Sequence, residues 1–131
     1  MPIKTRFVTK GFEEYYEALA RAGEDIDAAA DEALAAGGEV ILEGMRRRVP
    51  KLTGNLLRHL ECSQPQQDGN LHFVDIGLLR GTDAETARYG NVQEFGSSDM
   101  SAQPYVRPSF DEDMRAARLA MRKVFEAKGK L

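Results

Sequence analysis

The fold is decided by residues 25–48, which have the sequence DIDAAADEALAAGGEVILEGMRRR. Apolar side chains recur here at helical spacing and fall close to one face: Ile26, Ala30, Leu34, Ile41 and Met45. Asp25 is a plausible N-cap, and the helix should end at Val49-Pro50, because a residue before proline tends to leave the helical region. The pair Gly37-Gly38 costs about 2 kcal/mol relative to two alanines. It marks either a break between two helices or close packing of another backbone, and the pattern favours one continuous or kinked helix.

Shorter elements flank this helix on both sides. Residues 3–9 alternate apolar and polar side chains and predict a short edge strand, where Lys and Arg discourage further pairing. Residues 12–22 have apolar side chains at helical spacing. After the long helix, Thr53 either caps a short helix or starts a strand. Residues 64–70 then form a polar turn and residues 71–76 a strand, so the segments around that turn are expected to make an antiparallel hairpin.

The second half of the chain alternates between loops and ordered segments. Residues 79–86 predict a mobile loop, and residues 87–95 an ordered segment that is either helix or strand. Residues 96–103 form a loop rich in Ser and Gly. Residues 104–108, PYVRP, must be extended, because each proline fixes its own φ and restricts the residue before it. Pro108 then fits the first turn of a final helix.

The final helix has the clearest pattern in the chain. Its apolar stripe consists of Phe110, Met114, Ala117, Met121, Val124 and Phe125. Asp111, Glu112 and Asp113 are placed in its first turn, where carboxylates complement the helix dipole. The order of elements predicts an α+β fold, in which an antiparallel sheet packs against the long helix and the C-terminal helix. With 131 residues, the chain is expected to form a single domain spanning residues 1–131.

Little in the sequence points to catalysis, a metal or a cofactor. The net charge of −3 argues against nucleic-acid binding as the main task, and neither glycine-rich nucleotide-binding loop is present. Cys62, His59 and His72 lack a zinc spacing, and in a strand Cys62 and His59 would face opposite sides. We therefore predict no metal, no cofactor and no catalytic residue. With neither a signal peptide nor a membrane-spanning segment, the protein is expected in the cytosol.

Two features have more than one interpretation. The basic residues Arg46, Arg47, Arg48 and Lys51 lie around the end of the long helix, where cations suit the negative end of its dipole. They could also form an electropositive patch facing DNA or an acidic partner, which would suit a nucleic-acid-binding or regulatory module. Glu94 stands among apolar residues, and is either a surface residue or the partner of an arginine.

Three fragments, taken in order, are similar to one known family. They are VPKLTGNLLR at residues 49–58, ARYGNVQEFG at residues 87–96 and AQPYVRPSF at residues 102–110. Their order and content resemble the small tail-component family of long-tailed bacteriophages, whose members are known as head–tail joining or tail-completion proteins. Together with the order of elements, the resemblance extends over nearly the whole chain. The residues that carry the motifs are Pro50, Thr53, Gly54, Leu56, Tyr89, Glu94, Phe95, Gly96, Pro104, Tyr105, Arg107 and Pro108.

The resemblance implies a non-enzymatic virion protein of a tailed phage or prophage. Such a subunit would be assembled in the cytoplasm of the bacterial host and would work in the neck or tail of the virion. It would contact other neck and tail proteins as one copy in a homo-oligomeric ring, with DNA only as passing cargo and no membrane partner. Within the fold, Thr53-Gly54 would support a tight turn, Phe95 would anchor an aromatic ring in the core, and residues 104–108 would form a stiff strap.

Overall fold

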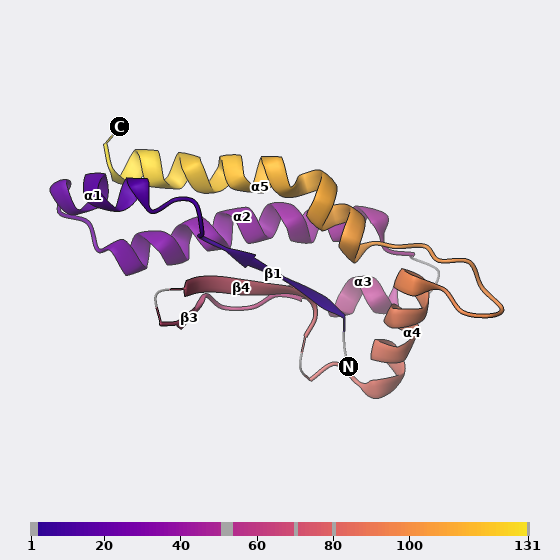
Figure 1. The fold of residues 1–131 in the computed structure, drawn as a ribbon. Helices are drawn as coiled ribbons and strands as arrows, with labels where there is room; N and C mark the ends of the chain where they lie inside the picture. The colour runs from indigo at the N-terminus through magenta and orange to yellow at the C-terminus, as the bar shows by residue number, and fades with distance from the viewer. Residues whose placement is uncertain (1–2, 51–53, 70, 80, 131) are drawn as a thin grey trace.

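The computed structural model describes residues 3–50, 54–69, 71–79 and 81–130, and shows a mixed α+β fold (Figure 1). The elements follow in the order β1 (Lys4–Val8), α1 (Glu14–Arg21), α2 (Ile26–Arg48), α3 (Asn55–His59), β2 (Leu60–Cys62), β3 (Gln66–Asp68), β4 (Leu71–Leu78), α4 (Ala84–Phe95) and α5 (Val106–Lys128). The predicted N-terminal strand, long helix, hairpin and C-terminal helix are thereby confirmed. Lys51 and Thr53 lie outside the described residues.

The sheet is built around β4, which pairs antiparallel with every other strand. β1 lies along one edge, with Lys4 opposite Gly77 and Val8 opposite Phe73. β2 and β3 share the other edge. In the segment between β2 and β3, the N–H of Ser63 donates to the carbonyl of Asp75 on β4 at 2.8 Å, so this segment is also hydrogen-bonded to β4. The predicted polar turn at residues 64–70 is wrong in part, because residues 66–68 form β3.

α2 runs without a break through its two central glycines. A Cβ at Gly37 would overlap the ring of Phe7 and lie 3.0 Å from the carbonyl oxygen of Ala117, and a Cβ at Gly38 would lie 2.8 Å from Sγ of Cys62. Glycine is a poor helix former, but it is needed at both positions. The side chains of Phe7 on β1 and Cys62 on β2 and the backbone of α5 approach too closely for a Cβ atom. Of the two interpretations left open by the sequence, close packing is the correct one.

The start of α2 is fixed by its predicted N-cap. A carboxylate oxygen of Asp25 accepts hydrogen bonds from the N–H groups of Asp27 and Ala28, at 2.9 and 3.2 Å. We expect Asp25→Ala to lower the free energy of unfolding by about 1 kcal/mol, as for other N-caps. Urea denaturation would measure this loss. Glu24→Ala, one residue away, should change the stability by less than about 0.5 kcal/mol, and an equal loss in both variants would contradict the capping role.

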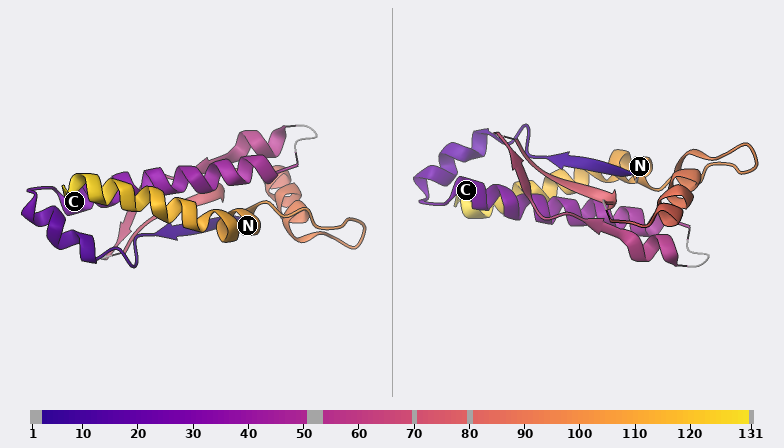
Figure 2. Two further views of the ribbon diagram at one scale, coloured as in Figure 1. Left: turned by 90° about the horizontal axis from the view of Figure 1, so that it is seen from above. Right: turned by 90° about the horizontal axis from the view of Figure 1, so that it is seen from below.

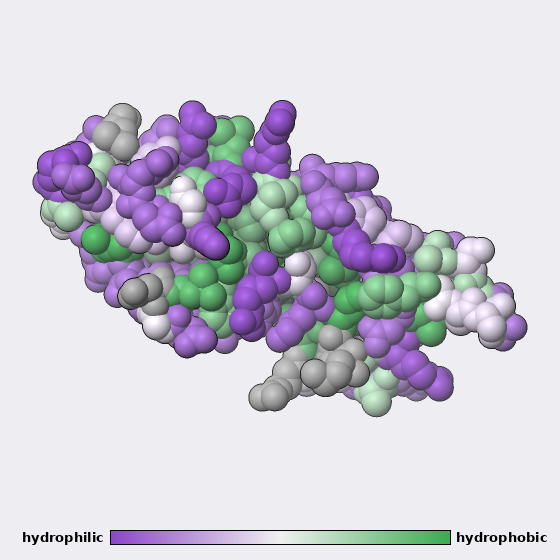
Figure 3. Space-filling model, viewed as in Figure 1, coloured by the Kyte–Doolittle hydropathy of each residue, from purple (hydrophilic) through white to green (hydrophobic). Residues whose placement is uncertain are grey.

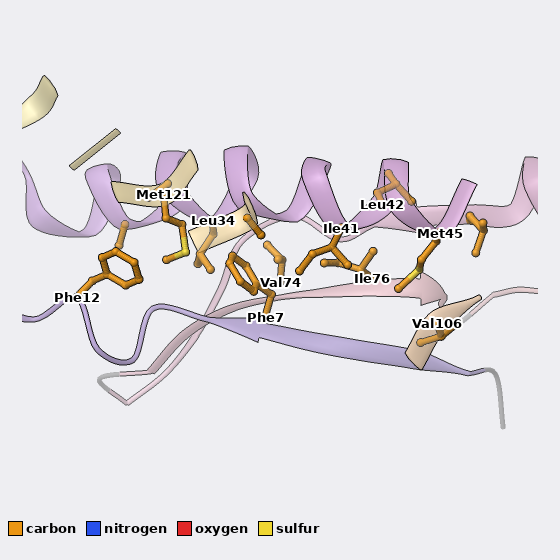
Figure 4. Packing of buried hydrophobic residues seen from close by; sticks show 14 of the residues in the cluster. Phe7, Phe12, Leu34, Ile41, Leu42, Met45, Val74, Ile76, Val106 and Met121 are labelled. Carbon is orange, nitrogen blue, oxygen red and sulfur yellow. The ribbon is translucent and has the colours of Figure 1, made fainter. Parts of the chain in front are cut away.

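Two helices cover one face of the sheet. α2 lies on the sheet and α5 runs alongside it, as the perpendicular views show (Figure 2). Between them and the strands lies a core of fully buried side chains (Figure 4), among them Phe7, Leu34, Ile41, Val74 and Met121. At one end of this layer α1 adds an aromatic group, in which the rings of Phe12, Tyr15 and Phe125 lie 5.5–5.9 Å apart.

The opposite face of the sheet is polar at its centre. Asp75 on β4 is buried there and accepts hydrogen bonds from Nζ of Lys4 at 3.2 Å and Nε of Arg6 at 2.8 Å. The guanidinium of Arg6 also lies over the ring of Phe73, 3.9 Å from its centroid. Long cationic side chains of β1 thus shield the middle strand on this face.

The molecule is elongated, with different elements at its two ends (Figures 1 and 2). α1 and β3 lie toward one end. α3, α4 and the connection between α4 and α5 lie at the other. The segment 87–95, whose type the sequence left open, is helical, and α4 begins at Ala84. The predicted loop at residues 79–86 is therefore too long by three residues, because Asp83 caps the helix by accepting from the N–H of Thr86 at 3.0 Å.

Candidate functional site

The most tightly organised polar group of the molecule joins α4 to α5 through Glu94. This side chain is wholly buried near the end of α4. Its Oε1 accepts from the N–H groups of Tyr105 and Val106, both at 2.8 Å, and its Oε2 from the N–H of Arg107 at 3.0 Å. The guanidinium of Arg107 donates to Oε2 at 2.8 Å and to the carbonyl of Glu94 at 2.8 Å. We call this arrangement the Glu94 clasp.

The clasp holds Glu94 in its ionised form. Burial of the carboxyl group opposes ionisation, but the backbone N–H groups of Val106, Arg107 and Tyr105 and the Arg107 guanidinium outweigh it. The pKa of Glu94 is therefore below its ordinary value. A carboxylate whose oxygens are occupied by backbone donors is suited to fixing a shape. It is poorly placed to exchange protons with a substrate. Of the two interpretations of Glu94, the arginine partner is confirmed and the surface residue is wrong.

The clasp also corrects the prediction for residues 104–108. The segment is not extended throughout, because α5 already begins at Val106 and Pro108 is its third residue. Proline is tolerated there, since the first four N–H groups of a helix have no intrahelical partner. Tyr105, the N-cap residue of α5, makes no capping hydrogen bond with its side chain. Glu94 accepts from the N–H groups at the helix start instead. Residues 111–113 therefore lie beyond the first turn of α5. Glu94, in their place, supplies the negative charge at the start of the helix.

Phe95 occupies a different position from the predicted one. Its ring is not in the core but is 59% exposed, and the Arg107 guanidinium lies 4.8 Å from the ring centroid. Residues 94 and 95 point about 100° apart on a helix, so a buried Glu94 turns Phe95 outward. Tyr105 is the buried aromatic of the motifs, and its hydroxyl donates to the carbonyl of Gly90 at 3.3 Å. Burial raises the pKa of that hydroxyl.

The other motif residues that the structure describes have roles in the backbone and the packing. Gly54 precedes α3 with a φ of +73°, and Leu56 is buried in the core. Gly96 has a φ of +79°, and a Cβ there would lie 3.0 Å from the carbonyl oxygen of Met100. Both glycines occupy backbone conformations that other residues rarely adopt. Pro50, Tyr89 and Pro104 are half-buried.

The arginines at the end of α2 are paired within the chain. Arg48 donates to Asp113 and to Glu112, each at 2.7 Å, and Arg46 pairs with Glu43. Burial opposes ionisation of Asp113, but the Arg48 guanidinium outweighs it and lowers the pKa of that carboxyl. Arg47 is more exposed, 3.4 Å from Asp113. These arginines lie in the last turn of the helix, and pairing with carboxylates reduces the electropositive patch that they could present.

Two residues that the sequence analysis considered for a zinc site, His72 and Cys62, are buried or half-buried in the sheet. His72 is buried on β4, with Nε2 3.1 Å from Asp27 and Nδ1 3.5 Å from Asp31, both on α2. Cys62 is a half-buried thiol, and burial raises its pKa to about 11.

Two other kinds of feature are absent from the part of the chain that the structure describes. Over the described ranges, no three or more His, Cys, Asp or Glu side chains are grouped so that they could hold a metal ion. None of the helices that the structure describes is long and apolar enough to cross a lipid bilayer.

Comparison with known proteins identifies the class of protein that carries this fold. The family described as "Bacteriophage HK97-gp10, putative tail-component" matches residues 11–96, about two thirds of the chain. The chain belongs to this family of phage tail components. No curated protein and no solved structure matches it. The matched segment includes Glu94, whereas the residues that Glu94 binds at the start of α5 follow it in the sequence.

Proposed function

We propose that this tail component is a non-enzymatic subunit that joins the head or connector to the tail, as one copy of a ring that completes the tail. The membership in the tail-component family over residues 11–96 carries the proposal. In this role the protein is assembled in the host cytoplasm and remains in the neck or tail of the virion. Its partners are other neck and tail proteins and further copies of itself, and DNA passes as cargo.

The roles of the motif residues support a structural task. Glu94, Arg107 and Tyr105 use their polar atoms to tie α4 to α5. Gly54 and Gly96 have positive φ angles, which the path of the backbone requires at these positions. A subunit that must present a fixed surface to its neighbours requires such internal connections. The nucleic-acid-binding alternative gains no support from the arginine cluster, because Arg46 and Arg48 are paired with carboxylates.

Within the proposed function, the end of α2 is a candidate interface with an acidic surface of a neighbouring tail or neck protein. Arg47 is its best representative, because its side chain is exposed and its ion pair with Asp113 is long. An exposed arginine of this kind adds little to stability, so it can be changed without unfolding the protein. Arg122 on α5 is a matched control, since it is also exposed and paired with a carboxylate, that of Glu126 at 2.9 Å.

The test is complementation of a phage from which the gene has been deleted. The deletion should yield heads without joined tails in electron micrographs, and the unchanged gene should restore tailed particles. Arg47→Glu should lower the yield of tailed particles about tenfold or more, because like charges facing each other in an interface cost several kcal/mol. Arg122→Glu should leave the yield unchanged. Normal tails without the gene would overturn the proposed function, and normal tails with Arg47→Glu would remove the end of α2 from the interface.

A further inference from the structure

One end of the molecule carries a projection, formed by residues 95–103 and here called the prong, that exposes two large apolar side chains. Phe95 and Met100 expose 59% and 44% of their surface, although both are large apolar residues. In Figure 3 the tip of the α4–α5 connection, at the right, is pale with purple at its outer edge, and green surface lies next to it, whereas the α1 end is mostly purple. Exposed apolar side chains gathered in one place are typical of contact sites.

Hydrogen bonds within the prong and to α4 support the shape of the prong. The N–H of Ser97 donates to the carbonyl of Met100 at 2.8 Å, and the N–H of Met100 donates back at 3.3 Å. The N–H of Gln103 donates to the carbonyl of Gln93 at 2.6 Å, and the Gln93 side chain donates to the sulfur of Met100 at 3.4 Å. Binding by a preorganised segment loses little conformational entropy.

A hollow of about 600 Å³ is lined by residues of the β1–α1 connection, α1, α2, β3 and β4. These elements come together toward the other end of the molecule (Figure 2). Its apolar lining includes Tyr16, Ile26 and Leu71, and Leu71 is 37% exposed. Glu13 and Asp27 place carboxylates in the same lining. Three of the four exposed large hydrophobic residues among those the structure describes thus belong to the prong or the hollow.

We propose that the hollow of one copy of this chain receives the prong of the next copy. Phe95 would enter the apolar lining beside Leu71, and the Arg107 guanidinium that lies against Phe95 would face Glu13 and Asp27. The two surfaces therefore match in apolar character, and each carries charges of both signs. Alongside Arg107 the prong carries Asp99, and alongside the two carboxylates the hollow is lined by Lys10. Because they lie toward opposite ends of an elongated molecule, the contact is head-to-tail, and such a contact closes into a ring when the rotation between copies fits. The inference rests on the proposed ring and adds the surfaces that form it.

The test uses one variant at each end and a control. Phe95→Asp places a charge on the prong and Leu71→Asp places one in the hollow. Leu119→Asp is the control, because Leu119 is 46% exposed on α5 and belongs to neither surface. All three positions are exposed, so the variants should keep the circular dichroism spectrum and melting temperature of the wild type. Sedimentation measures the mass of the species in solution. Changes in NMR chemical shifts, followed up to about 1 mM protein, detect weaker association, with a Kd in the millimolar range.

The wild type and Leu119→Asp should both associate as the concentration rises, whereas each end variant alone should stay a monomer. An equimolar mixture of Phe95→Asp and Leu71→Asp should form pairs and nothing larger, because one variant keeps the hollow and the other keeps the prong. The inference is overturned if the end variants associate like the wild type, if the mixture forms no pairs, or if the wild type shows no contact at 1 mM by either method. Complementation by the wild-type gene stays unaffected by any of these results, so the proposed function is tested separately.

Discussion

Glu94→Ala is expected to lower the free energy of unfolding by about 3–5 kcal/mol, because each buried N–H group left without an acceptor costs about 1–3 kcal/mol. The substitution leaves the N–H groups of Tyr105, Val106 and Arg107 without their acceptor at the start of α5. Two of these three residues are buried, so water replaces the lost bonds poorly. The ion pair itself contributes less, because the Arg107 side chain is largely exposed. Urea denaturation followed by circular dichroism would measure the loss.

Two related variants separate the capping role from the ion pair. Glu94→Gln keeps one acceptor oxygen and should cost less than Glu94→Ala. Arg107→Ala keeps all three backbone bonds and should cost about 1 kcal/mol, as expected for a partly exposed pair. If Arg107→Ala were as damaging as Glu94→Ala, the ion pair rather than the cap would hold α5 in place.

The clasp should also make the protein sensitive to acid. Since the pKa of Glu94 in the folded protein is below its ordinary value of 4.5, the stabilisation is fully present above that pH. It is lost as the pH falls below 4.5 toward the folded pKa, because the unfolded chain then binds the proton more readily. In Glu94→Gln this contribution is absent, so its stability should fall less steeply with acid than that of the wild type.

Gly37→Val is expected to destabilise the protein by about 3 kcal/mol, at the upper end of the cost of overpacking a core. The new Cβ would overlap the Phe7 ring and lie 3.0 Å from the carbonyl oxygen of Ala117, which belongs to the backbone of α5. Neither neighbour can move freely, since Phe7 is buried and Ala117 lies within a helix. The helix would have to separate from β1 or from α5. Thermal and urea denaturation would both report the loss.

Ala35→Val is the matched control for this prediction. Residue 35 lies on the exposed side of the same helix, so valine there changes only the helix propensity, by about 0.6 kcal/mol. If the two valine variants lost equal stability, close packing at Gly37 would not explain why glycine stands in the middle of α2.

The sequence predicts those parts of the fold whose cause is local. The apolar spacing from Ile26 to Met45 and the cap at Asp25 define α2, and the stripe that ends at Phe125 defines most of α5. Alternation in residues 3–9 defines β1. In each case one element has its own apolar face and its own end signal, so no distant residue is needed to interpret it.

The errors of the sequence analysis arise where a distant residue decides the local structure. Two prolines predict an extended segment at residues 104–108, but α5 starts inside it because Glu94 caps the helix from α4. Phe95 is expected in the core because it is aromatic, yet burial of its neighbour Glu94 turns it outward. Pairing to β4 likewise makes a strand of the polar residues 66–68, which have no apolar alternation of their own.

The candidate site was predicted in its residues but not in its geometry. The motif residues Glu94 and Arg107 were both named from the sequence, thirteen positions apart. The packing of α4 against the start of α5 brings these two residues together. Only this packing shows that they bind each other and that the carboxylate accepts from the backbone N–H groups of α5. The arginines at the end of α2 were also named, but their carboxylate partners on α5 were assigned to the helix dipole.

The packing of α5 along α2 means that the segment of this chain that matches the family does not contain the whole core. The family match ends at Gly96, whereas the buried side chains of Ala117, Met121 and Phe125 come later and complete the layer over the sheet. A fragment cut at that boundary would leave the flank of α2 exposed to water and would have no donors for Glu94. The boundary of shared sequence should therefore not be used as an expression boundary.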